Sequence, residues 1–183
     1  LGPFFSCPLG DKENGFNIEG LAARGERVFL GLRGPVLDGW AILLELELEE
    51  REPGALTPRE KGGKAYKKHF LDLEGLGIRE LQFLGDDLLV LAGPTMKLEG
   101  EMALYRLRDA VGRAHDSLAS RDDGELELLF SLPWTRGADH AEGLACLPCL
   151  GEPNALLIVY DSPHPTRVAG PGRVFADIFR LPV

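Results

Sequence analysis

Short apolar runs separated by glycine-rich turns are the dominant pattern of this chain. The segment Trp40–Leu48 alternates leucines with glutamates, which places the two kinds of side chain on opposite faces of a strand. Other apolar runs, such as Leu88–Ala92 and Ala155–Tyr160, have the length of a strand and fall short of a membrane span. The pattern predicts an all-β protein.

The predicted strands recur as three copies of one unit. Each copy has a short first strand with a glutamate, then a turn, then an apolar second strand that ends with a small residue and proline. The first strands are Asn17–Ala22, Ile78–Phe83 and His140–Ala145, and the second strands are Val28–Pro35, Leu88–Pro94 and Leu156–Pro163. Glu19, Glu80 and Glu142 recur at spacings of 61 and 62 residues. Such repetition indicates a fold of equal supersecondary units.

Each unit continues with further strands. Third strands are predicted at Trp40–Leu48 and Ala103–Leu107, fourth strands at His69–Leu73 and Leu126–Leu132, and the third unit ends with Val174–Leu181. Four short strands per unit are typical of the blades of a β-propeller. We therefore expect a single domain, 1–183, with three four-stranded blades near 17–76, 77–139 and 140–183, as part of a six-bladed ring. The alternative is a β-sandwich with coincidental repeats.

Two segments interrupt the repeating pattern. Arg51–Lys68 is rich in glycine, proline and basic residues, which predicts a solvated loop between a third and a fourth strand. Arg106–Ser120 spaces its apolar residues as on one face of a helix, which predicts a short surface helix.

Three blades are too few to close a propeller, whose usual range is about four to eight blades. An open arc would leave sheet edges and an apolar blade face uncovered. We expect the ring to be completed by blades upstream of this chain, by a second copy of the chain, or by a different chain. The loop-like start at Leu1, which is not a methionine, favours missing upstream residues.

Composition narrows the range of partners. The net charge of −9 repels phosphate backbones, so nucleic acid is not an expected partner, whereas a cation is compatible with it. Three cysteines, an odd number, predict no disulfide framework. No signal peptide and no membrane span are visible, and the compartment stays open between cytoplasm and periplasm.

The runs Ile18–Ala22 with Leu32–Pro35, Gly77–Leu81 with Leu91–Pro94, and His140–Leu144 resemble a bacterial family known only as a domain of unknown function. Its members are about twice as long, and the chain resembles their C-terminal half. The resemblance implies a propeller with upstream blades and no established activity. More distantly, the Glu-Gly-Leu blade starts are similar to those of esterase-like phytases and lactonase-type propellers, whose acidic channel residues hold calcium. The chain lacks a complete match to their catalytic residues.

Acidic residues at the blade starts are the first candidates for a functional site. The first strand of each propeller blade lines the channel, so Glu19, Glu80 and Glu142 would converge there. Converging carboxylates repel one another unless a cation or a basic group lies between them. Calcium, which takes about six to eight oxygen ligands, would suit such a site. Arg79 and His140 could neutralise the carboxylates instead, or each glutamate could cap nearby backbone amides.

Further candidates lie beside these glutamates. His140 and Glu142 would share one face of their strand, which makes them an acid–base pair with Arg79 as a neighbouring cation. These three residues are the catalytic candidates. Arg33 and Asp161 are expected at equivalent ends of second strands, where opposite charges could face a ligand, one another or solvent.

Cys146 and Cys149 form a Cys-x-x-Cys pair, which could be half of a zinc site or a redox pair. A zinc site would need two more ligands, and Cys7 and a histidine would have to come from distant parts of the chain.

Three functional hypotheses follow. A ligand- or partner-binding scaffold is expected for a propeller without a complete catalytic set, with Glu19, Arg33, Glu80 and Asp161 as its ligand-binding residues. The second hypothesis is a calcium-assisted hydrolase of a phosphate or carboxylic ester at the channel mouth. The third is half of an obligate ring assembly.

Overall fold

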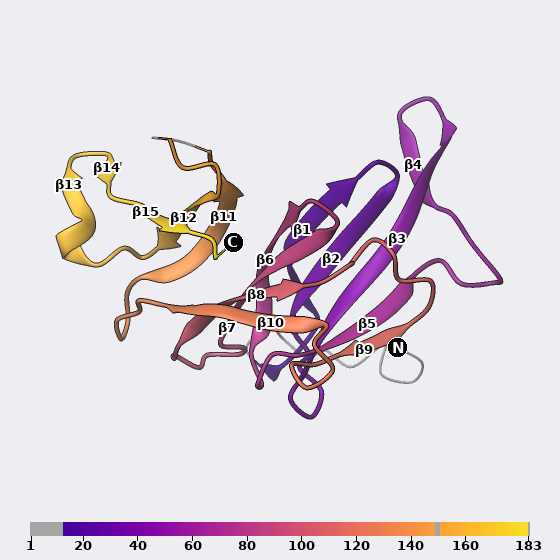
Figure 1. Cartoon of the computed structure of the whole chain (residues 1–183), viewed down its shortest axis with the longest axis horizontal. Coiled ribbons are helices and arrows are strands. Elements are labelled where there is room, and N and C mark those ends of the chain that lie inside the picture. Colours follow the sequence, from indigo (N-terminus) through magenta and orange to yellow (C-terminus); the bar gives the residue numbers. More distant parts are fainter. Residues whose placement is uncertain (1–12, 149–150, 183) are drawn as a thin grey trace.

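The computed structural model describes residues 13–148 and 151–182, which form several antiparallel β-sheets (Figure 1). Sheet I has the strand order β1 (Asn17–Arg24), β2 (Arg27–Gly34), β3 (Trp40–Glu52), β5 (Lys67–Asp72) and β9 (Ser117–Ala119), and β4 (Ala55–Pro58) pairs with the end of β3. Sheet II has the order β6 (Gly77–Leu84), β7 (Asp87–Gly93), β8 (Met102–Leu107) and β10 (Leu126–Leu132). Sheet III has the order β11 (His140–Cys146), β12 (Ala155–Asp161) and β15 (Asp177–Arg180).

A short ribbon of β13 (Val168–Gly170) and β14 (Arg173–Val174) lies between β12 and β15 in the chain, after the 3₁₀ turn Pro165–Arg167. The all-β prediction is confirmed. The described strands form open sheets and do not close into a ring.

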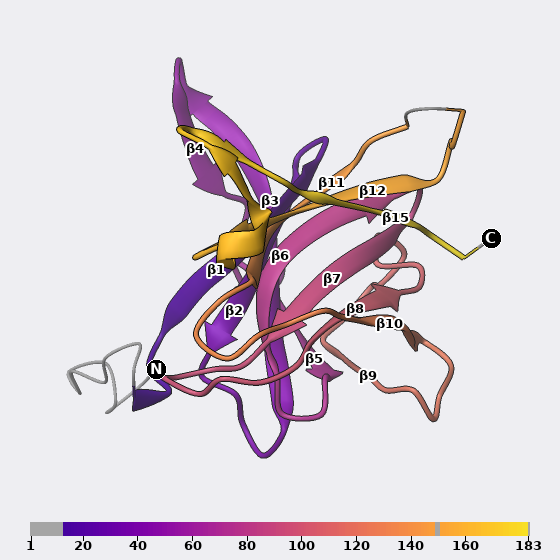
Figure 2. The same cartoon turned by 90° about the vertical axis from the view of Figure 1, so that its left-hand side faces the viewer.

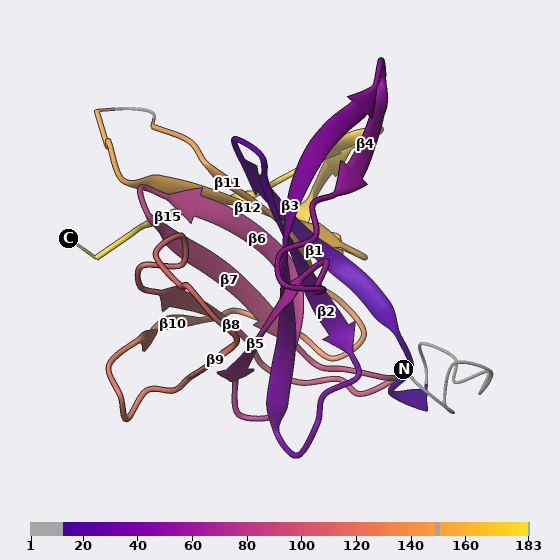
Figure 3. The same cartoon turned by 90° about the vertical axis from the view of Figure 1, so that its right-hand side faces the viewer.

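The three sheets follow one another in chain order, with sheet II between the other two (Figure 2 and Figure 3). Their first strands are neighbours, because β6 lies against β1 and β2, and β11 lies against β6. One apolar core joins sheets I and II, and a second core joins sheets II and III. Strand β7 serves both: Leu88 and Val90 belong to the first core, and Leu89 and Leu91 belong to the second. Burial on both faces explains its uninterrupted apolar run.

Small residues on sheet I allow β6 to approach closely. A Cβ atom at Gly31 would lie 2.3 Å from Ile78 Cγ2, and one at Gly20 would lie 2.9 Å from Leu81 Cγ. Ile78 and Leu81 are both buried. The two glycines therefore form the surface on which the first strand of sheet II packs.

The predicted helix over Arg106–Ser120 is wrong. The segment forms turns and then β9, which pairs in parallel with β5 and extends the edge of sheet I. Asp109 adopts a left-handed φ of 45°, and its side chain accepts a hydrogen bond from Gly112 N, so the local turn replaces the first helical turn.

No helix in residues 13–148 or 151–182 is long and apolar enough to span a membrane.

Two other expectations need correction. The loop predicted at Arg51–Lys68 is partly a hairpin, because β3 continues to Glu52 and pairs with β4. The single strand predicted at Val174–Leu181 is divided into β14 and β15, and β15 pairs with β12 next to it. The fourth strand of the second unit, by contrast, has the predicted bounds, Leu126–Leu132.

We predict that Gly31→Ala lowers the free energy of unfolding by about 1–3 kcal/mol, because the added methyl group would overpack the contact with Ile78. Urea denaturation measures the difference. Gly100→Ala is the matched control, since a Cβ atom there meets only Pro94 Cγ at an ordinary 3.6 Å. Equal losses for the two variants would contradict the assigned close packing.

Candidate functional site

Each first strand carries one extra residue at the same place in its ladder with the second strand. The register skips a residue between Ile18 and Gly20 in β1, between Ile78 and Glu80 in β6, and between Ala141 and Gly143 in β11. The skipped residues are Glu19, Arg79 and Glu142. Bulges of this kind redirect a side chain out of the regular pleat.

Arg79, and not Glu80, is therefore the structural equivalent of Glu19 and Glu142. The prediction that Glu80 takes this position is wrong by one residue. A leucine follows each bulge residue by two positions: Leu21, Leu81 and Leu144. Aligning the three repeats on these leucines places Arg79 at the position of Glu19 and Glu142. Two of the leucines, Leu81 and Leu144, are buried.

These residues form an ionic chain that crosses all three sheets. Arg33 Nη1 lies 3.1 Å from Glu19 Oε1, and Glu19 Oε2 lies 3.1 Å from Arg79 Nη1. The same Nη1 atom lies 3.1 Å from Glu142 Oε1, and Arg79 Nη2 donates to Pro94 O at 3.0 Å. We call Arg33, Glu19, Arg79 and Glu142 the Arg79 junction. It joins β1 and β2 of sheet I to β6 of sheet II and β11 of sheet III.

The junction has a buried centre and a more open periphery. Arg79 is 8% exposed, whereas Glu19 and Arg33 are half-buried and Glu142 is exposed. Burial lowers the pKa of Arg79, and neighbouring Arg33 acts in the same direction, whereas Glu19 and Glu142 oppose the change. Because an arginine stays protonated in proteins, the centre of the junction carries a positive charge that its carboxylates compensate.

This geometry does not fit the expected calcium site. Arg79 occupies the place between Glu19 and Glu142 that a cation would take. Glu80 Oε1 instead accepts hydrogen bonds from the backbone amides of Leu81 at 2.9 Å and Leu21 at 3.5 Å. Among the described residues, no group of three or more histidine, cysteine, aspartate or glutamate side chains is placed to hold a metal ion.

A cavity of about 320 Å³ adjoins the junction. It lies between the first strands of sheets II and III and the connection from β7 to β8. Its charged lining residues are Arg33, Arg79, Lys97, Glu99 and Glu142, and His140 lines it as well. The Nε atoms of Arg33 and Arg79 are buried and have no hydrogen-bond partner among the described residues. The three catalytic candidates, Arg79, His140 and Glu142, therefore meet at this cavity, which we call the junction cavity.

The predicted equivalence of Arg33 and Asp161 is wrong. At the start of each ladder, Asn17 pairs with Gly34, Gly77 with Gly93 and His140 with Asp161, so the equivalent of Asp161 in the first unit is Gly34. Arg33 precedes Gly34 and lies at a register shift. Arg33 reaches Glu19 and donates to Met96 O at 2.7 Å, while exposed Asp161 lies across the ladder from His140.

The cysteines contribute no site within the described residues. Cys146 is half-buried, and burial raises the pKa of its thiol, which disfavours the reactive thiolate. Cys7 and Cys149 lie outside the described residues, so the predicted Cys146–Cys149 pair stays a prediction.

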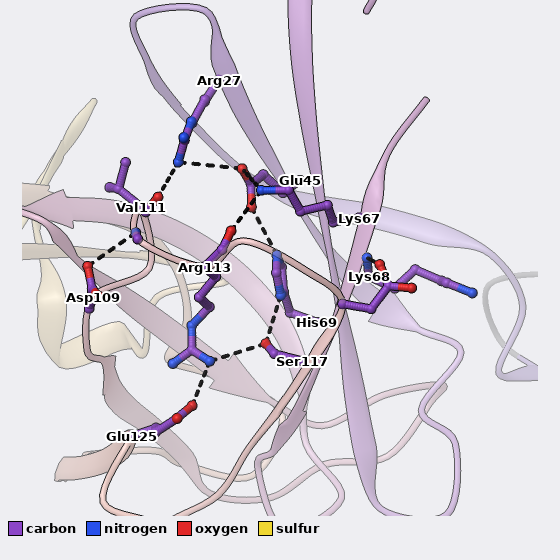
Figure 4. Close-up of polar contacts among 12 residues, drawn as sticks. Arg27, Glu45, Lys67, Lys68, His69, Asp109, Val111, Arg113, Ser117 and Glu125 are labelled. Carbon is purple, nitrogen blue, oxygen red and sulfur yellow. Dashed lines mark hydrogen bonds and ion pairs between the residues drawn. The ribbon is translucent and has the colours of Figure 1, made fainter. Parts of the chain in front are cut away.

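A second polar cluster, which the sequence patterns did not predict, fastens β9 to sheet I (Figure 4). His69, fully buried on β5, has Nε2 3.1 Å from Glu45 Oε2 and Nδ1 2.8 Å from Ser117 Oγ. Arg113 Nη1 lies 3.1 Å from the same Oγ and 2.6 Å from Glu125 Oε2. An arginine can only donate, so the Ser117 hydroxyl accepts from Arg113, and the imidazole of His69 links this hydroxyl to the Glu45 carboxylate.

The cluster has the residue types of a nucleophilic triad, but its geometry indicates a structural role. The imidazole of His69 is enclosed and both its nitrogens are occupied. Its partners are Glu45 of β3 and Ser117 of β9, so the imidazole links the edge strand β9 to the interior of sheet I. A larger hollow nearby, of about 470 Å³, has its arginine and lysine side chains paired: Arg59 and Lys61 with Glu47, Lys64 with Asp116, and Lys67 with Glu45. The junction cavity is therefore the better candidate site.

The fold and the site define an all-β protein of three stacked, mainly antiparallel sheets whose first strands are joined by an ionic chain. The chain belongs to the DUF3616 family, described as a protein of unknown function, whose model matches residues 1–177. The resemblance to a family without an established activity is thereby confirmed. No curated protein and no solved structure matches the chain, so the comparisons show no relationship to propellers or phytases.

We predict that Arg79→Met lowers the free energy of unfolding by about 1–3 kcal/mol, because it leaves the carboxylates of Glu19 and Glu142 without their shared buried donor. Chemical denaturation monitored by tryptophan fluorescence measures the change. The control, Arg121→Met, removes an exposed pair with Glu74 and is expected to cost less than about 1 kcal/mol. A loss for Arg79→Met no larger than the control would contradict the importance of the junction.

Glu45 provides a test in acid. Burial would raise its pKa, but hydrogen bonds from His69 and Lys67 outweigh burial, and the pKa of Glu45 is lowered in the folded protein. A carboxyl with a lowered folded pKa stabilises the protein above its unfolded pKa of about 4.3, and this contribution disappears as the pH falls through the folded pKa. We expect the stability difference between the wild type and Glu45→Gln, measured by urea denaturation, to shrink from pH 7 to pH 3.

The control for this series is Glu60→Gln, since Glu60 is exposed and forms no ion pair among the described residues. Its stability difference from the wild type is expected to stay near zero throughout. A difference for Glu45→Gln that is constant with pH would show that the carboxylate charge does not stabilise the fold.

Proposed function

We propose that the chain is the three-bladed part of a β-propeller and that it works as a binding scaffold for a small anionic ligand. The four-stranded antiparallel order of sheet II is that of a propeller blade. The adjacency of β1, β6 and β11 corresponds to first strands that surround a central channel. Sheets I and III are then the neighbouring blades.

The single observation that carries the ligand-binding proposal is the convergence of equivalent bulge residues on the junction cavity. Two of the three, Arg79 and Glu142, line that cavity, and the third, Glu19, binds Arg79. Equivalent positions of a repeat face the shared axis, where propellers bind ligands. The junction orders these side chains before any ligand arrives, which reduces the entropic cost of binding.

The free hydrogen-bond donors of the cavity favour an anion. Lys97 is exposed and forms no ion pair among the described residues, and His140 has no side-chain hydrogen bond there. The Nε atoms of Arg33 and Arg79 also lack partners, but they are buried, so Lys97 and His140 are the accessible free groups. Of the acidic lining residues, Glu142 is engaged by Arg79, and Glu99 accepts from Gly137 N at 3.2 Å. A carboxylate or phosphate group matches this set of donors.

The calcium-assisted hydrolase is not carried forward, because Arg79 takes the place of the cation. Asp161 and Glu80 do not line the junction cavity, so the ligand-binding residues we propose are Arg33, Arg79, Lys97 and His140.

We predict that citrate and inorganic phosphate bind the wild type and that Lys97→Gln weakens this binding about tenfold, because a charge-assisted hydrogen bond is lost. Isothermal titration calorimetry at low salt measures both. Lys68→Gln removes the same charge from an exposed position on β5, away from the cavity, and is expected to leave the affinity unchanged. The absence of binding heat for both anions, or equal losses for the two variants, would contradict an anion site.

A further inference from the structure

The connection from β7 to β8 carries two opposite charges that line the junction cavity and do not pair with each other. Both residues, Lys97 and Glu99, are exposed. Glu99 Oε2 accepts a hydrogen bond from Gly137 N and lies 3.8 Å from Nε of Arg136, whose side chain is 93% exposed, so solvent screens this ion pair. Within residues 13–148 and 151–182, Glu99 Oε1 has no hydrogen-bond partner.

The other charges around the cavity compensate one another within the Arg79 junction. Arg79 is shared by the carboxylates of Glu19 and Glu142, and Arg33 pairs with Glu19. Two arginines therefore balance two glutamates. The charges that this pairing leaves on the cavity wall are the ammonium of Lys97 and the carboxylate of Glu99. A ligand with one acidic and one amino group would satisfy both of them, whereas a simple anion would satisfy only the lysine.

The backbone that carries these two charges is fixed on both sides of Lys97. Before it, Met96 O accepts a hydrogen bond from Arg33 Nη2 at 2.7 Å, and Met96 has a left-handed φ of 56°. After it, Glu99 accepts from the backbone amide of Gly137 at 3.2 Å. The connection is thus held by sheet I through Arg33 and by the segment that leads to β11 through Gly137. Such anchoring places an ammonium and a carboxylate on the cavity wall before a ligand binds.

An apolar wall completes the cavity. Its apolar lining residues are Pro94, Met96, Leu98 and Met102. Pro94 and Met102 are buried, whereas Leu98 is 59% exposed. An apolar group of a ligand would leave water on contact with this wall, which favours binding. The volume of about 320 Å³ is that of a site for a small molecule.

We propose that the acidic group bound in the junction cavity is the carboxylate of an α-amino acid with an apolar side chain. Lys97 and His140 bind the carboxylate, Glu99 Oε1 accepts from the ammonium group, and the side chain lies against the apolar wall. This inference rests on the proposed function, because it uses the same donors for the acidic group. It adds the amino group and the apolar side chain that select one class of ligand.

Three probes of nearly equal shape test the assignment by isothermal titration calorimetry at low salt. L-Leucine carries both charged groups, isocaproate lacks the ammonium group, and isoamylamine lacks the carboxylate. L-Leucine is expected to bind the wild type about tenfold more tightly than either analogue, because each analogue loses one charge-assisted hydrogen bond. Equal affinities for L-leucine and isocaproate would overturn the amino-acid assignment.

Variants of the connection show which group recognises the ammonium. Glu99→Gln is expected to abolish the preference for L-leucine over isocaproate, because the carboxylate that complements the ammonium is lost. Glu101→Gln is the matched control: Glu101 is exposed in the same connection and does not line the cavity, so this variant is expected to keep the preference. Lys97→Gln is expected to weaken both ligands alike. A full preference in Glu99→Gln would contradict the role of Glu99.

The same titrations separate this inference from the function on which it rests. Binding of citrate and phosphate with the expected dependence on Lys97, but without any preference for L-leucine over isocaproate, would leave the anion site standing and overturn only the amino-acid assignment. The absence of binding heat for every probe would overturn both.

Discussion

Burial of one guanidinium group between carboxylates of two other strands is the interaction on which the arrangement of the three sheets depends. Arg79 is the only member of the Arg79 junction that contacts both sheets I and III through its side chain. A buried cation is costly unless it is fully paired, so the relative positions of β1, β6 and β11 are restricted to those that supply Glu19 and Glu142. The apolar cores hold the sheets together, and the junction restricts the positions of their first strands relative to one another.

The position of this arginine has a consequence for function. A cavity lined by carboxylates alone would attract metal ions. With an arginine at one of three equivalent bulges, the acidic groups are compensated within the protein. In the function we propose, local donors and not the net charge of −9 select the ligand of the junction cavity.

Packing between the sheets uses two different surfaces of one repeat. Sheet I offers the glycines Gly20 and Gly31 to the bulky Ile78 and Leu81. Sheet II offers Leu89 and Leu91 to sheet III. Successive units can therefore stack although the sizes of their contacting residues differ, because small residues on one sheet are matched by large residues on the next.

Most of the strands, the three units and the group of charged residues at the start of each unit follow from the pattern of the amino-acid sequence. These features depend on local alternation and on repetition, which are visible in a single chain. It also placed Arg79, His140 and Glu142 together as candidates, and they do meet at one cavity.

Which charged residue takes the equivalent position is visible in the strand pairing alone, because a bulge shifts the register by one residue without changing the pattern of apolar positions. The burial of Glu45 also depends on the tertiary structure. The alternation of β3 assigns that glutamate to a solvent face, but the segment predicted as a helix folds over it and buries it against His69. Burial of a polar side chain depends on what a distant segment covers, and no local pattern contains that information.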